Sequence, residues 1–207
     1  MNINNIYNFT INNLVESNVY YFIQNKITRL SSNLLAIKDD KILVNSNEWL
    51  YLLNKAYYPN NGPYNEIVNL YYYMNFSKNK SIKINEKVIT FVTSFSYGTV
   101  HGYAGFFYIL LEYLKNKDKY KDYKILFLEN TQSGIKQILH NAINKNIIDK
   151  NKIIYIESDK LYLIKELLII PNKHHNIMGT KLADDIYNYI NKYFSNIKSI
   201  SNYKRFD

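Results

Sequence analysis

The residues whose types could do chemistry begin with His101, in a glycine-containing stretch that follows a short apolar run at 88–92. The glycine spacing, G-x-x-x-G-x-x-G, is not the dinucleotide fingerprint, and no Gly-Lys-Ser/Thr closes it as a phosphate-binding loop would. A loop between a strand and a helix still presents backbone amides to anions, and a histidine there can act as a general base or contact a phosphate. We take His101 as a catalytic candidate; the alternative is a hydrogen-bonded loop histidine. The neighbouring binding candidates are Gly102, Tyr103 and Gly105.

Glu129 directly follows a second apolar run, at 124–128, and Gln132 and Ser133 come soon after it. A carboxylate at the carboxyl end of a strand is well placed to take a proton from a hydroxyl group. Ser133 has no G-x-S-x-G context, so a nucleophile elbow is not expected. Glu129 is therefore a second catalytic candidate, and Gln132 and Ser133 are binding candidates.

His174 and His175 follow a later apolar run, at 167–170. Adjacent side chains point in different directions and rarely chelate one metal ion, so we expect them to contact substrate, with polar loop residues as the alternative. The chain has no cysteine, which excludes disulfides, thiolate zinc sites and cysteine nucleophiles. We expect neither a metal nor a cofactor.

The elements that must position these residues follow from hydrophobic patterning. Short apolar, β-branched runs predict strands at 88–92, 124–128, 152–156 and 167–170. Apolar residues at helical spacing predict helices at about 106–115, 133–143 and 180–197. This alternation predicts an α/β fold with a Rossmann-like parallel sheet and helices on both faces. Ligands bind such sheets at the carboxyl ends of the strands, so the turns around Gly102, Asn130 and His174 should converge on a shared hollow.

The chain divides near residue 86. Residues 1–86 are irregular, with a strand-like run at 41–44 and a turn-rich segment at 58–63 that holds two of the three prolines. We expect this segment of short strands and turns to pack on a Rossmann-like domain formed by residues 87–207.

Composition limits the classes of partner. Lys+Arg 26 against Asp+Glu 17 gives a net charge of +9, and a basic surface attracts phosphates and nucleotide-linked substrates. Arginine occurs only at Arg29 and Arg205, so the chain has few side chains for the bidentate contacts by which proteins recognise bases. Nucleic acid is therefore not an expected partner. The chain shows no signal peptide and no run of about 18 apolar residues. We therefore expect a cytoplasmic protein with no membrane span.

Three stretches of the second half carry a family resemblance. The first, at 105–114, reads GFFYILLEYL; the second, at 124–130, reads KILFLEN and leads into a helix. The third runs from KIIYIESD at 152–159 through Leu161 and Tyr162 to LLIIP at 167–171. In this order they resemble the glycosyltransferase family 61 type domain of capsular-polysaccharide, xylan and O-GlcNAc transferases. The resemblance covers about residues 88–198.

The resemblance implies transfer of a sugar from a nucleotide sugar, as substrate, to a glycan or protein acceptor. The family has a histidine in its first helix where this chain has Tyr108, and an acidic partner that Glu112 matches. Glu112 is thereby a third catalytic candidate, and Tyr108 a binding candidate. The resemblance also implies one half of a GT-B-like architecture, so the donor-binding half would come from a homodimer, a partner chain or a continuation of this chain.

Two alternatives stay open at this point. The domain could be a degenerate transferase that serves as a non-catalytic subunit or scaffold through its tyrosine-rich surfaces. It could also process nucleotides, as a phosphoesterase or nucleotidyltransferase that attracts its substrate with lysines.

Overall fold

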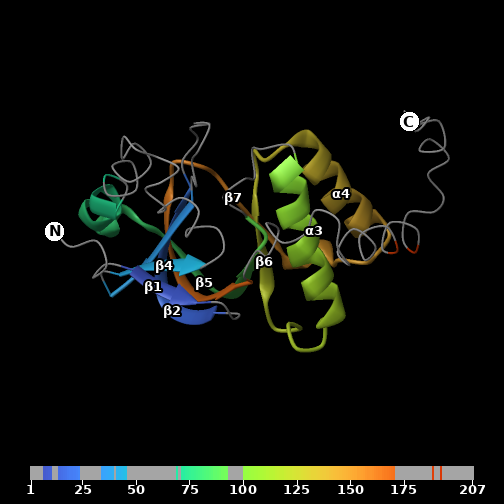
Figure 1. Cartoon of the computed structure of the whole chain (residues 1–207), viewed down its shortest axis with the longest axis horizontal. Helices are drawn as coiled ribbons and strands as arrows, with labels where there is room; N and C mark the ends of the chain where they lie inside the picture. Colours follow the sequence, from blue (N-terminus) through green and yellow to red (C-terminus); the bar gives the residue numbers. More distant parts are fainter. Residues whose placement is uncertain are drawn as a thin grey trace, which may run out of the picture.

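The computed structural model describes residues 7–10, 14–23, 34–39, 41–45, 69, 71–92, 100–170, 188 and 192 (Figure 1). Its strands are β1 (Tyr7–Thr10), β2 (Leu14–Ile23), β3 (Leu34–Lys38), β4 (Lys41–Asn45), β5 (Ile82–Thr90), β6 (Lys124–Leu128), β7 (Ile153–Ile156) and β8 (Leu161–Ile169). Its long helices are α3 (Val100–Lys115) and α4 (Ser133–Asn144). Residues 71–76 form a further helical segment, and Lys78–Lys80 and Lys150–Lys152 form short 3-10 turns. No helix in this described part is long and apolar enough to cross a bilayer.

The strands form one mixed sheet in the order β1-β4-β3-β2-β8-β5-β6-β7. The four strands β8, β5, β6 and β7 are parallel to one another, as the alternation of apolar runs and helices predicts. The expectation of a wholly parallel sheet is wrong, because β2 pairs antiparallel with β8 and β3 continues the antiparallel ladder to β4. The fold is thus of the α/β class, and strands from before and after residue 86 share a single sheet.

Most predicted elements of the second half are present. Strands overlap all four predicted runs, at 88–92, 124–128, 152–156 and 167–170. Strand β5 ends two residues before its predicted run does, and β5 and β8 begin about six residues earlier than expected. The glycine-containing stretch is the exception: helix α3 already begins at Val100, so His101, Gly102 and Gly105 lie on a helix and not in a loop. The helix expected at 180–197 falls outside the described residues except for the helical backbone of Asn188 and Lys192.

A bend crosses three adjacent strands of the sheet. Asn18 of β2 has a φ of 56°, and the β5–β8 register shifts between Ile84 and Lys87. On β8, Ile164 and Leu167 face the same apolar cluster although they are three residues apart, which simple strand alternation does not allow. Irregularities of this kind increase local twist, and here they fold the sheet over on itself.

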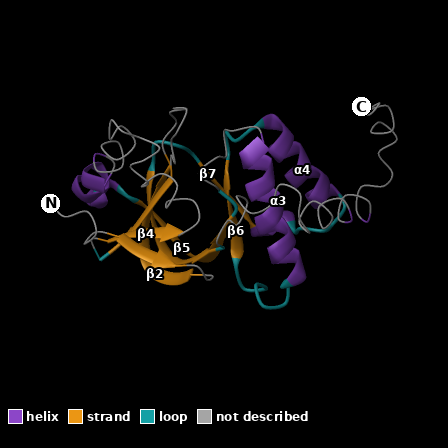
Figure 2. Cartoon of the chain, viewed as in Figure 1, coloured by secondary structure: helices purple, strands orange, loops and turns teal. Residues whose placement is uncertain are grey.

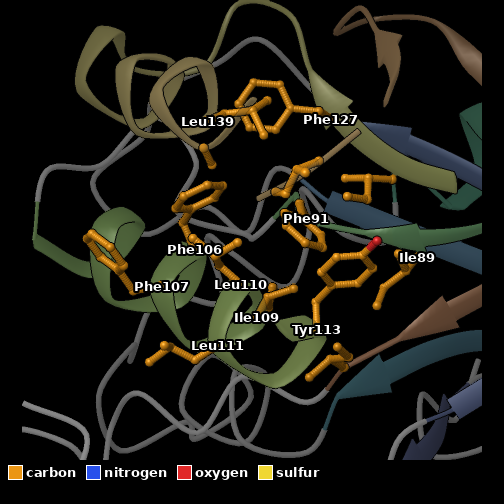
Figure 3. Close-up of a cluster of buried hydrophobic side chains, with 14 of the residues drawn as sticks. Ile89, Phe91, Phe106, Phe107, Ile109, Leu110, Leu111, Tyr113, Phe127 and Leu139 are labelled. Carbon is orange, nitrogen blue, oxygen red and sulfur yellow. The ribbon is translucent and has the colours of Figure 1, made fainter. Parts of the chain in front are cut away.

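The folded sheet has two apolar faces. Helices α3 and α4 both cover the outer face of the parallel strands, where Phe91 meets Phe106 and Tyr113 edge-on at centroid distances of 6.0 and 5.6 Å (Figure 3). The inner face has no helix among its clustered residues. It is filled by side chains from both halves of the sheet, including Val19, Tyr21, Ile84, Val88, Leu126, Leu128, Ile156 and Ile164.

The inner face brings distant strand ends together. The Tyr21 hydroxyl lies 2.7 Å from the Thr90 Oγ1, a buried contact between β2 and β5, although β8 separates these two strands. Strand β7 also joins β8 through only four residues, 157–160, whereas even adjacent parallel strands need a crossover of a dozen or more, and β5 and β6 lie between these two in the sheet order. The short link is possible because the bend carries the end of β7 to the beginning of β8.

We expect Thr90→Val to destabilise the protein by about 1–3 kcal/mol, because it removes the buried contact with Tyr21 and also the Oγ1 that accepts the Val92 N–H at 3.1 Å. Tyr21→Phe removes only the first of these and should cost about 1 kcal/mol. Urea denaturation of both variants measures the difference. A Thr90→Val protein as stable as the wild type would show that the contact does not hold the sheet closed.

Candidate functional site

Polar side chains from two neighbouring parallel strands meet where those strands end. Glu129 and Asn130 follow β6, and Glu157 and Ser158 follow β7. The Asn130 amide donates a hydrogen bond to the Ser158 hydroxyl at 3.0 Å, and the Glu129 backbone N–H donates to the Ile156 carbonyl at 2.8 Å. We call this group the carboxyl edge; it is formed by residues 129–133 and 157–160. It lies at the end of the sheet where α/β proteins bind ligands.

The turn between β7 and β8 adds a cation to the carboxyl edge. Lys160 forms an ion pair of 2.6 Å with Glu157. The hydrogen bond to Glu157 raises the pKa of Lys160, and the negative charge of Glu129 raises it further. Burial raises the pKa of Tyr162, whose hydroxyl accepts the Glu157 backbone N–H at 2.9 Å. The edge therefore holds an exposed lysine near two exposed carboxylates, beside a buried phenol that stays protonated.

The beginnings of α3 and α4 meet beside this edge. The Tyr103 hydroxyl lies so close to Gly134 that a Cβ added there would come within 1.7 Å of the oxygen. Gly134 is in the first turn of α4, next to exposed Ser133 and to Gln132 at the N-cap position. The beginnings of the two helices thus bring together three of the binding candidates from the sequence: Tyr103, Gln132 and Ser133.

The remaining sequence candidates lie elsewhere or outside the described part. His101 and Gly102 belong to the first turn of α3, but their side-chain surroundings are not described; Gly105 is buried one turn further along. His174 and His175 fall outside the described residues. Of the three turns expected to converge, two lie in the described part of the chain, near Tyr103 and near Asn130. The third, at His174, falls outside it.

Glu112 and Tyr108 form a separate pair on α3. Glu112 accepts a hydrogen bond of 2.9 Å from the Asn116 amide, and burial followed by the charge of Glu112 raises the pKa of Tyr108. Nine residues separate Glu112 from Tyr103, which is about 13 Å along a helix axis. The structure therefore does not bring Glu112 to the carboxyl edge.

Sequence reasoning missed Ser158 and Lys160 as site residues. A signal was present, because the acidic turn at 157–159 is part of the stretch that carries the family resemblance. The place of this turn in the site depends, however, on the hydrogen bond from Asn130, which follows the neighbouring strand. Within the described residues, no group of three or more His, Cys, Asp and Glu side chains is placed to hold a metal ion.

A second polar network involves Tyr123, Glu166 and Lys87. The Tyr123 hydroxyl donates a 2.6 Å hydrogen bond to Glu166, whose other oxygen lies 3.3 Å from the Lys87 Nζ. Burial, reinforced by Glu166, raises the pKa of Tyr123 to about 12, so the phenol stays protonated and cannot act as a base near neutral pH. Tyr123 precedes β6, at the opposite end of that strand from Glu129, so this network is structural.

Comparison of the chain with protein-family models, with curated proteins and with solved structures finds no match. The interpretation of the carboxyl edge therefore depends on its own geometry and chemistry.

Gly134→Ala tests the contact between the two helix beginnings. The added methyl group must displace the Tyr103 ring, so we expect a loss of about 1–3 kcal/mol in the free energy of unfolding. In a Tyr103→Ser background the same change should be neutral or stabilise the protein by up to about 1 kcal/mol, because the obstacle is gone and alanine favours the helix. Equal costs in both backgrounds, measured by urea denaturation, would refute the contact.

Tyr123→Phe tests the structural network. The hydrogen bond from Tyr123 and the neighbouring Lys87 lower the pKa of Glu166, so the ionised carboxylate adds stability above its unfolded-state pKa and loses it as pH falls through the folded-state pKa. The variant should raise the pKa of Glu166, and its stability deficit should be larger at neutral pH than in acid. Titration of the Glu166 carboxyl by NMR measures this shift; identical midpoints in both proteins would contradict it.

Proposed function

We propose that this chain binds a nucleotide sugar at the carboxyl edge and transfers the sugar to a glycan or protein acceptor. The observation that supports the proposal is the junction of Asn130 with Ser158 beside the first turn of α4, at the carboxyl ends of parallel strands. A sugar ring or ribose needs paired hydrogen-bonding groups of this kind, fixed on rigid elements. The resemblance of residues 88–198 to the glycosyltransferase family 61 type supports sugar transfer, and it implies that a second half completes the donor site.

The charges of the edge suit a phosphate-linked donor. Backbone amides at the start of a helix and the positive end of its dipole attract phosphate, and α4 begins at Ser133 with no acidic residue in its first turn. Lys160 can leave its exposed ion pair with Glu157 and contact the departing nucleotide phosphate. Such positive groups stabilise the charge that develops on the leaving group.

Glu129 is the residue we assign as the general base. Its side chain is exposed at the end of β6, and its charge influences both Lys160 and Tyr162. In the proposed reaction the carboxylate takes the proton of an acceptor hydroxyl, the hydroxyl oxygen bonds to the anomeric carbon, and the nucleotide phosphate leaves with the electron pair of the broken bond. His101, the first catalytic candidate from the sequence, is the alternative for this role or for a phosphate contact. A second copy of the chain or a partner chain would supply the remaining donor contacts.

We expect Glu129→Gln to lower kcat for sugar transfer by about 10²–10⁴-fold while donor binding persists, because the amide keeps the shape but cannot accept the proton. His101→Ala should abolish transfer or donor binding with little change in melting temperature. His140→Ala, an exposed position on α4, is the matched control and should behave as the wild type. Release of nucleoside diphosphate from a panel of nucleotide sugars, with thermal shifts for binding, provides both readouts.

Two results would replace the proposal by its alternatives. A wild-type protein whose melting temperature shifts with no nucleotide sugar favours the non-catalytic scaffold. Hydrolysis or joining of nucleotides without sugar transfer favours a phosphoesterase or nucleotidyltransferase.

A further inference from the structure

The helical residues 71–76, which lead into the turn before β5, expose large aromatic side chains. Phe76 is 83% exposed, and Tyr72 and Tyr73 are 40% and 47% exposed. Exposed side chains of this size gathered in one short stretch indicate a surface that contacts something. We call residues 71–83 the aromatic–lysine turn.

The aromatic–lysine turn is held in place by the core and by its own backbone. Tyr71 and Met74 are buried, and the Tyr73 ring packs against Phe22 of β2 at 5.3 Å. Hydrogen bonds join the Ser77 N–H to the Tyr73 carbonyl at 3.0 Å and the Lys80 N–H to the Ser77 carbonyl at 2.9 Å. The exposure of Phe76 is therefore a property of the folded backbone that carries it.

The same turn carries positive charge only. Residues 71–83 contain Lys78, Lys80 and Lys83 and no acidic residue. Lys80 and Lys83 are exposed, and the Lys78 Nζ lies over the Tyr20 ring at 5.3 Å. The nearest acidic residue after the turn, Glu86, pairs with Lys124 at 3.6 Å. A partner of this surface must therefore offer an apolar interior that Phe76 can enter, together with negative charge.

We propose that the aromatic–lysine turn docks on an anionic lipid surface. Phe76 would enter the boundary between headgroups and acyl chains, the tyrosines would sit at headgroup level, and Lys80 and Lys83 would contact lipid phosphates and carboxylates. Lysine point charges suit a diffuse anionic surface, whereas base readout favours arginine, which this turn lacks. The helix of residues 71–76 lies across the sheet from α3 and α4, so docking there leaves those two helices uncovered (Figure 1 and Figure 2).

Flotation of the full chain with vesicles tests the proposal. The wild type should bind vesicles of phosphatidylcholine and phosphatidylserine at low salt and bind pure phosphatidylcholine only weakly. Phe76→Ser should weaken binding by roughly tenfold or more, and Lys80→Glu with Lys83→Glu by on the order of twentyfold. The controls are Tyr155→Ser, an aromatic that is 46% exposed on β7, and Lys121→Glu with Lys150→Glu, a charge-matched exposed pair. Circular dichroism checks that every variant is folded.

Three outcomes would overturn the lipid surface. The first is a wild type that floats with neither kind of vesicle. The second is an equal loss of binding in the two sets of lysine variants, and the third is a Phe76→Ser variant that binds as the wild type does. A single-stranded oligouridylate is the competing probe: if it binds and the Phe76 and Lys80/Lys83 variants lose it while vesicles do not bind, the partner is nucleic acid.

Discussion

The contact between the Tyr21 and Thr90 hydroxyl groups closes the inner face of a sheet that bends across β2, β8 and β5. Their strands are not neighbours, so the contact exists only because the sheet is folded over. The interior that it closes is otherwise apolar, with Val19, Val88 and Ile164 fully buried. A polar pair in such surroundings must be satisfied, and this requirement favours one arrangement of the two halves over looser alternatives.

The bend also determines where the polar residues of the carboxyl edge lie. In a flat sheet, β7 could not reach β8 in four residues, because β6 and β5 lie between them. In the folded sheet the turn at 157–160 is anchored from three sides. The Glu157 N–H donates to Tyr162, the Asp159 N–H donates to the Ile23 carbonyl at 2.8 Å, and Ser158 accepts from Asn130. Asp159 adopts a φ of 60° to make this turn. A rigid polar turn between two strand ends is the central element of the proposed ligand site.

The sequence predicted the elements that carry their own signal. Strands such as Lys124–Leu128 are short runs dominated by apolar residues, and helix α4 repeats its apolar residues at helical spacing. Strand β2 escaped prediction because Glu16, Ser17 and Asn18 interrupt its apolar pattern, and its place in the sheet comes from pairing with β8. Glycines at 102 and 105 indicated a loop, yet they lie on α3, and Gly105 is buried there. Contacts between distant residues, such as Tyr103 with Gly134, leave no mark on local patterning.

The most direct test of the central claim is a map of backbone amide chemical shifts as a nucleoside diphosphate is added to the labelled protein. If the carboxyl edge binds the phosphate-linked donor, the largest shifts should fall on residues 129–134 and 157–160, at the ends of β6 and β7 and the start of α4. Shifts centred on Tyr123, Lys87 and Glu166, or none at residues 129–134 at saturating nucleotide, would contradict the account.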